Sequence, residues 1–149
     1  MNPFLLTPTE RLADWKVLRS SIASLEDDVA LDTVTKYWAQ APLMRLAYDY
    51  EEMPKWPGPW AMVHQGDWCR DSVACGMEFT LRLGGWAPER MRLILVKDFD
   101  ISEQMIVLEI DRTIFLNYDV GKVTPLPNTR WASIAAWEFT GRGYHPIKC

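Results

Sequence analysis

One cysteine lies where the sequence predicts the start of a helix. Cys69 begins a mostly apolar segment that runs to about Leu83 and is closed by Gly84-Gly85, a pair typical of a helix end. Three apolar residues recur along it at helical spacing, namely Val73, Met77 and Leu81. Unpaired backbone N–H groups and the helix dipole stabilise a thiolate in the first turn of a helix. Cys69 is therefore the candidate nucleophile of a cysteine hydrolase.

A catalytic cysteine also needs a base within hydrogen-bond reach and a third group that orients the base. The sequence has two histidines, His64 and His145. His64 lies five residues before Cys69 and is the candidate for a relocated base, whereas His145 lies in a C-terminal tail that contains glycine and proline. For both, a solvent-exposed loop histidine is the simpler interpretation.

The N-terminal third of the chain is expected to be helical. Thr7-Pro8-Thr9-Glu10 matches a capping box with proline at the first helical position, and this helix runs to about Ile22. A second helix is expected from about Leu25 to Ala41, where Pro42 stops it. The segment from Asp49 to Pro59 is rich in proline and is expected to be a loop.

After Pro88 the pattern changes to short runs that are typical of strands. The predicted strands are Met91 to Val96, Gln104 to Ile110, Thr113 to Leu116, Lys122 to Thr124 and Ile134 to Phe139, with a hairpin turn at Asp111-Arg112. Helices followed by antiparallel strands are the α+β pattern. Residues 1–149 are therefore expected to form one domain, in which N-terminal helices and a buried central helix that carries Cys69 pack on an antiparallel sheet.

Composition excludes several classes of partner. The chain has 149 residues and a formal net charge of −4, so neither nucleic acid nor an anionic membrane is an expected partner. No basic segment followed by an apolar one occurs near residue 1, and a cytoplasmic location is expected when the protein is made. The three cysteines lack metal-ligand spacing, and no metal or cofactor is expected. Cys149 is expected to be an incidental free thiol, with a disulfide between chains left open.

Short motifs follow one another through the middle of the chain. Leu31-Asp32-Thr33-Val34-Thr35-Lys36-Tyr37 matches Leu-x-x-Val-Asn-x-Tyr, Trp56-Pro57-Gly58-Pro59-Trp60 matches Trp-x-x-Pro, and Gly66-Asp67-Trp68-Cys69-Arg70-Asp71 is close to Gly-Asp-Cys-Glu-Asp. This order resembles the bacterial transglutaminase-like cysteine proteinase family, which includes periplasmic proteases that clip biofilm adhesins. The resemblance implies a transglutaminase-like (papain-like) fold with Cys69 at the position of the nucleophile.

The same resemblance implies incomplete catalytic machinery. The family's histidine position falls on Met105 and its acid position on Asn117. A thioether cannot accept a proton from a thiol at neutral pH, so general-base activation would fail and Cys69 would be a vestigial nucleophile. Acidic residues beside the cysteine bind calcium in some members of the family. Here Trp68 intervenes and Arg70 replaces the glutamate, so a calcium site is not expected.

The favoured hypothesis for function is a non-catalytic transglutaminase-like fold that serves as a structural, assembly or protein-interaction module. The chain has eight tryptophans, which are many for one small core, and tryptophan is enriched at interface anchors. Trp56 and Trp60 are the expected interaction residues, toward a protein partner or a second copy of the chain. The segment that joins them also resembles small proteins of tailed bacteriophages, which implies a role in a virion or its assembly.

Two alternatives are left open. The first is a cysteine hydrolase or peptidase that uses Cys69 with His64 as its base. The second is a small-ligand binder that reuses the old active-site cleft, lined by Trp68, Met105 and Asn117. A histidine ring near Cys69 would favour the first alternative, and an open apolar pocket would favour the second.

Overall fold

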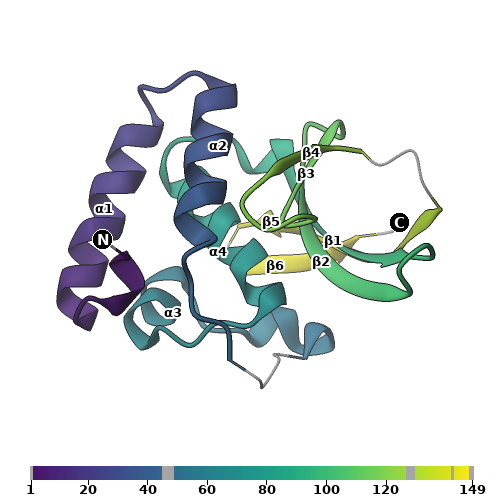
Figure 1. The fold of residues 1–149 in the computed structure, drawn as a ribbon, viewed down its shortest axis with the longest axis horizontal. Helices are drawn as coiled ribbons and strands as arrows, with labels where there is room; N and C mark the ends of the chain where they lie inside the picture. Colours follow the sequence, from purple (N-terminus) through teal and green to yellow (C-terminus); the bar gives the residue numbers. More distant parts are fainter. Residues whose placement is uncertain (1, 45–48, 127–129, 142, 148–149) are drawn as a thin grey trace.

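The computed structural model describes residues 2–44, 49–126, 130–141 and 143–147. In the described residues a helical layer packs on a six-stranded sheet, so the expected α+β class is confirmed (Figure 1). The helices are α1 (Pro8–Ile22), α2 (Asp27–Trp38), α3 (Pro59–Gln65) and α4 (Arg70–Leu83), with short 3₁₀ segments at Pro3–Leu5, Tyr50–Lys55 and Pro88–Arg90. None of these helices is both long and apolar enough to cross a membrane.

The sheet is antiparallel throughout its described strands. Its order is β4-β3-β2-β1-β5-β6. The strands are β1 (Met91–Asp98), β2 (Glu103–Ile110), β3 (Ile114–Leu116), β4 (Val123–Pro125), β5 (Trp131–Thr140) and β6 (Gly143–Ile147). The predicted hairpin turn between β2 and β3 is confirmed, because Asp111 and Arg112 both have positive φ (50° and 60°), as a two-residue type I′ turn requires.

The central helix α4 lies between the other helices and one face of the sheet (Figure 1). Every residue from Ser72 to Leu81 is buried. Residues that alternate along β1 and β2, such as Leu93 and Leu108, join the core beneath α4, whereas Ile94 and Val107 belong to a second, smaller cluster on the opposite face. The expected buried central helix is confirmed, and both faces of the middle strands are covered.

A buried hydroxyl on α4 holds two tryptophans from the outer helices. The Oγ1 of Thr80 accepts hydrogen bonds from Nε1 of Trp15 on α1 (3.0 Å) and of Trp38 on α2 (2.9 Å), and it donates to the carbonyl of Gly76 (2.7 Å). Gly76 is needed at that point because a Cβ there would lie 2.7 Å from the ring of Trp38. The Thr80 side chain on α4 thus joins this helix to both α1 and α2.

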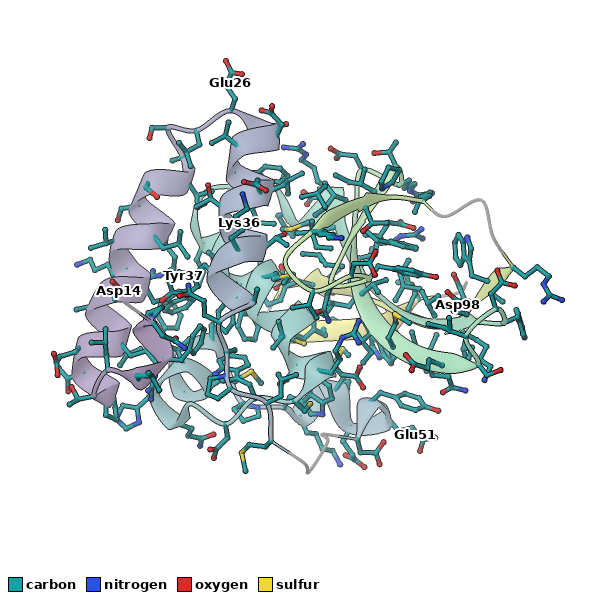
Figure 2. The ribbon with its side chains drawn as sticks, in the orientation of Figure 1. Asp14, Glu26, Lys36, Tyr37, Glu51 and Asp98 are labelled. Carbon is teal, nitrogen blue, oxygen red and sulfur yellow. The ribbon has the colours of Figure 1, made fainter. Side chains whose placement is uncertain are left out.

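The outer helices also contact each other directly. The hydroxyl of Tyr37 on α2 donates to the carboxylate of Asp14 on α1 (3.2 Å), and the two side chains point toward one another (Figure 2). Burial of the phenol, together with the nearby Asp14 charge, raises the pKa of Tyr37. At the start of α1, Thr7 caps the backbone N–H of Glu10 (3.3 Å), so the predicted helix start is confirmed.

Two elements differ from the sequence prediction. The segment expected to be a loop from Asp49 to Pro59 contains a 3₁₀ helix, and α3 begins at Pro59, a residue that suits the first helical position. The C-terminal tail forms β6, which pairs with β5 and contacts the buried carboxylate of Glu78 on α4. This carboxylate accepts from Arg82 (2.9 Å) and from the hydroxyl of Tyr144 on β6 (2.6 Å).

Thr80→Val should destabilise the protein by roughly 2–4 kcal/mol, because the substitution keeps the side-chain shape but leaves two buried indole N–H groups without an acceptor. Urea unfolding followed by circular dichroism measures the change. Thr33→Val is the matched control, since the Thr33 hydroxyl bonds only the carbonyl of Val29 on an exposed part of α2, and it should change stability by less than about 0.5 kcal/mol. Equal effects of the two substitutions would contradict this role of Thr80.

Candidate functional site

Cys69 lies at the N-cap of α4 and is 3% exposed. Its Sγ accepts a hydrogen bond from the backbone N–H of Ser72 (3.4 Å), and the Ser72 hydroxyl accepts from the backbone N–H of Cys69 (2.8 Å). This reciprocal pair is a capping box in which the thiol takes the place of the usual hydroxyl. Cys69 therefore has a structural task at the helix start, and its role as a vestigial nucleophile stays a prediction.

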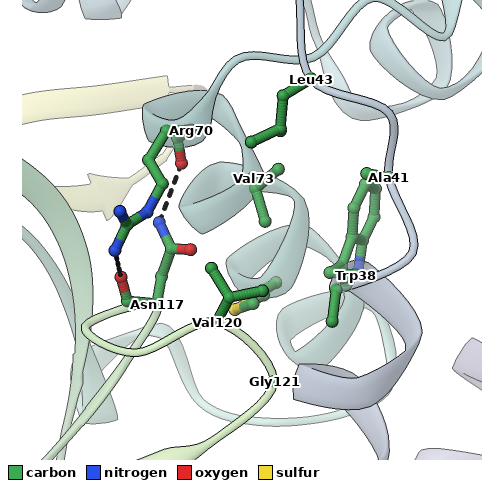
Figure 3. Close-up of a pocket in the computed structure, with 10 residues that line it drawn as sticks. Trp38, Ala41, Leu43, Arg70, Val73, Asn117, Val120 and Gly121 are labelled. Carbon is green, nitrogen blue, oxygen red and sulfur yellow. Dashed lines mark hydrogen bonds between the residues drawn. The ribbon is translucent and has the colours of Figure 1, made fainter.

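Arg70 reaches from α4 toward the strands that would carry the base and the acid. Its Nη2 donates to the carbonyls of Asn117 (3.1 Å) and Tyr118 (2.9 Å) and lies 3.9 Å from Sδ of Met105. In return, Nδ2 of Asn117 donates to the carbonyl of Arg70 (2.9 Å), as Figure 3 shows. It also donates to the carbonyl of Ile106 (3.0 Å). The guanidinium thus lies beside both sequence-predicted triad positions.

Neither side chain at these two positions can act as a base or as an orienting acid. The Met105 thioether cannot take a proton from a thiol at neutral pH, and the Asn117 amide is not ionisable and uses its N–H groups on two carbonyls. Asn117 also has φ of 71°, a left-handed conformation that asparagine tolerates well. Its side chain therefore serves the turn after β3 instead of orienting a base.

In the described part of the chain, no hydrogen bond joins His64 to Cys69. His64 lies in the last turn of α3 with its side chain exposed. The adjoining backbone is held by the buried Arg11, which donates to the carbonyls of Val63 (2.7 Å) and His64 (2.7 Å). His64 was expected in a loop, and its placement in a helix is a correction, while its exposure agrees with the simpler interpretation.

His145 lies on the edge strand β6, opposite Glu138 of β5, and is exposed. Two whole strands, β1 and β5, separate β6 from β2, which carries Met105. His145 is therefore remote from the position at which a base for Cys69 would be needed.

The three residues expected to line a cleft do not share one. Trp68 is fully buried in the helical layer, with its ring 4.5 Å from that of Trp38, and Met105 is buried in the cluster on the other sheet face. Asn117 alone of the three lines the small hollow in Figure 3, which has a cavity volume of about 30 Å³ and also contacts Leu43 and Val120. A cavity of that volume holds about one water molecule.

The two tryptophans expected to make interactions differ in exposure. Trp60, on α3, is 52% exposed. Trp56 is half-buried, and its Nε1 donates to the carbonyl of Asp49 (2.9 Å). Trp60 therefore presents the larger free surface, and its role in an interface stays a prediction.

The two acids beside Cys69 have different surroundings. Asp71 accepts a hydrogen bond from the backbone N–H of Ile106 (3.1 Å), and burial raises its pKa although that bond and the Arg70 charge act in the opposite direction. Asp67 is exposed. Within the described ranges no cluster of three or more histidine, cysteine or acidic residues could hold a metal ion, and calcium requires a larger set of oxygen ligands. Cys149 lies outside the described residues.

Comparison with solved structures identifies the fold. Legionella pneumophila LapG matches with a TM-score of 0.72 and 17% identity, covering 92% of this chain and 78% of that one. This chain has the transglutaminase-like fold. The EGTA-treated LapG structure (TM-score 0.73, 17% identity, 95% of this chain and 78% of that one) and the calcium-bound structure (0.71, 17%, 91% and 77%) agree. No protein-family model and no curated protein gives a significant match.

Removal of the thiol tests the cap. Cys69→Ser should leave the free energy of unfolding unchanged or raise it, because serine is a preferred N-cap, and Cys69→Ala should lower it by about 1 kcal/mol. Cys75 is the matched control, a buried cysteine inside α4, where serine would bury a hydroxyl and should cost roughly 1–2 kcal/mol. Urea unfolding measures all three, and a Cys69→Ser cost equal to that of Cys75→Ser would argue against the cap.

Calcium should not stabilise this chain. The melting temperature with 1 mM calcium should lie within about 1 °C of that in EGTA, since a cation stabilises only a state that it binds. LapG, whose structures are available in both calcium-bound and EGTA-treated forms, provides the comparison protein. A saturable rise in melting temperature that Asp71→Asn abolishes would reveal a calcium site.

Proposed function

We propose that this protein is a non-catalytic transglutaminase-like domain that acts as a structural, assembly or protein-interaction module. The observation that carries the proposal is the environment of Cys69. The buried thiol caps α4, and Arg70 lies hydrogen-bonded beside Met105 and Asn117, where a base and its orienting acid would be needed. A fold can persist without its chemistry, because function depends on the site rather than on the architecture.

The cysteine-hydrolase alternative has less support. LapG is a bacterial periplasmic cysteine protease, but the identity of 17% extends only to the fold. A working enzyme would need a base near Cys69, and the candidate His64 is exposed on α3, whose end is held by Arg11. Arg11 holds the backbone carbonyls of Val63 and His64, and the described residues include no hydrogen bond between His64 and Cys69.

The ligand-binding alternative also has less support. Drug-sized and cofactor-sized ligands occupy pockets of roughly 300–1,000 Å³, whereas the hollow beside Arg70 and Asn117 has a volume of about 30 Å³. Interaction with another protein does not require such a pocket, and the exposed Trp60 offers an anchor for it. A place in a virion, a bacteriophage source and a cytoplasmic location stay predictions of the sequence.

Alkylation of the folded chain tests the proposal. With iodoacetamide at neutral pH and mass-spectrometric readout, Cys69 should react at least about a hundredfold more slowly than in the urea-unfolded chain, because reaction requires local opening. The buried Cys75 provides an internal reference. His64→Ala should leave the rate at Cys69 unchanged. Fast alkylation of Cys69 that collapses in His64→Ala would overturn the non-catalytic proposal.

A further inference from the structure

Arg19, in the last turn of α1, is stacked on aromatic rings. Its guanidinium carbon lies 4.2 Å from the ring centroid of Trp15 and 5.6 Å from that of Trp60. Trp15 is fully buried, and Trp60 meets it edge-on with ring centroids 6.0 Å apart and planes at 76°. The cation is therefore fixed over a rigid aromatic platform that joins α1 to α3.

Within the described residues the guanidinium of Arg19 has no hydrogen-bond acceptor or carboxylate partner, and its Nε is buried. Burial lowers the pKa of Arg19, since the charged form is less well solvated there. Every other described arginine that is at least partly buried donates to a carbonyl or a carboxylate, and these are Arg11, Arg70, Arg82, Arg90 and Arg92. Among the described residues Arg19 thus lacks a protein acceptor, and its buried Nε–H has no hydrogen-bond partner.

An exposed apolar side chain lies next to this cation. Trp60 is 52% exposed, and tryptophan and arginine are the residue types most enriched among the anchors of protein interfaces. A carboxylate is the group that a guanidinium fork binds best, and it would neutralise a positive charge that stands out in a chain of net charge −4. The free face of Trp60 would accept a neighbouring apolar side chain.

We propose that Arg19 and Trp60 form the docking site for a protein partner that presents a carboxylate side chain beside an apolar side chain. The inference rests on the proposed interaction function, whose partner chemistry it specifies. Its occupant is a different protein, because two copies of a chain with a net charge of −4 repel each other.

A peptide titration tests the site directly. The probe is acetyl-Leu-Glu-Leu-amide, compared with the isosteric acetyl-Leu-Gln-Leu-amide, and the readout is the indole N–H resonances of the full chain by NMR. The glutamate peptide should shift the resonance of Trp60 and should bind about tenfold more tightly than the glutamine peptide. Arg19→Gln should remove that tenfold preference, and Trp60→Ala should weaken both peptides.

Arg112→Gln is the matched control. Arg112 is exposed in the turn between β2 and β3, so its loss changes the net charge equally without touching the site. Should Arg19→Gln fail to fold, Trp60→Ala still tests the site, because Trp60 is largely exposed. Equal binding of the two peptides by the wild-type chain would overturn the proposal, as would an equal loss in Arg112→Gln.

A dimer seen by sedimentation that Arg19→Gln dissociates would assign the surface to a second copy and overturn the proposed occupant. The docking proposal and the non-catalytic proposal can fail separately. The peptide titration tests the docking site, whereas alkylation of Cys69 tests the non-catalytic function. Slow alkylation of Cys69 together with equal binding of the two peptides would support the non-catalytic function and overturn the docking site at Arg19.

Discussion

The burial of α4 is the constraint on which the rest of the structure depends. The polar groups of a helix that is covered on nearly every side must find hydrogen-bond partners within the protein. Where a neighbouring side chain packs closely against such a helix, the helix needs a small residue. Gly76 supplies the close approach of Trp38, Thr80 accepts from two tryptophans, and Glu78 draws Arg82 and β6 onto the helix. The helical layer and the last strand are both organised by residues of this one helix.

The start of α4 follows the same logic. Cys69 and Ser72 satisfy each other's backbone N–H groups, and Arg70 and Asn117 exchange hydrogen bonds with backbone carbonyls across the gap to the strands. These contacts connect α4 to β2 and β3 without any ionisable base. In this chain these groups serve packing and capping, and the fold shared with LapG does not by itself imply shared chemistry.

Much of this was predictable from the sequence. The helical spacing after Cys69, the N-cap at Thr7 and the turn at Asp111-Arg112 are local signals, and the structure agrees with them, although no reciprocal bond from the Thr7 backbone to Glu10 completes a capping box among the described hydrogen bonds. The helix at Pro59 was missed because the prolines before it favoured a loop, and the strand at Tyr144 was missed because glycine and proline in the C-terminal tail favoured irregular structure. The cleft expected around Trp68 was non-local, since its burial against Trp38 could not be inferred from the order of motifs.

The central claim is that Arg70, and no imidazole, lies beside the strand positions where a base for Cys69 would be needed. A crystal structure of the full chain tests it most directly, through the distance from Cys69 Sγ to the nearest imidazole nitrogen. We expect no imidazole within hydrogen-bond reach, about 3.2 Å, and the Arg70 guanidinium bonded to the carbonyls of Asn117 and Tyr118. A histidine ring hydrogen-bonded to the Cys69 thiol, with Arg70 turned to solvent, would contradict the account.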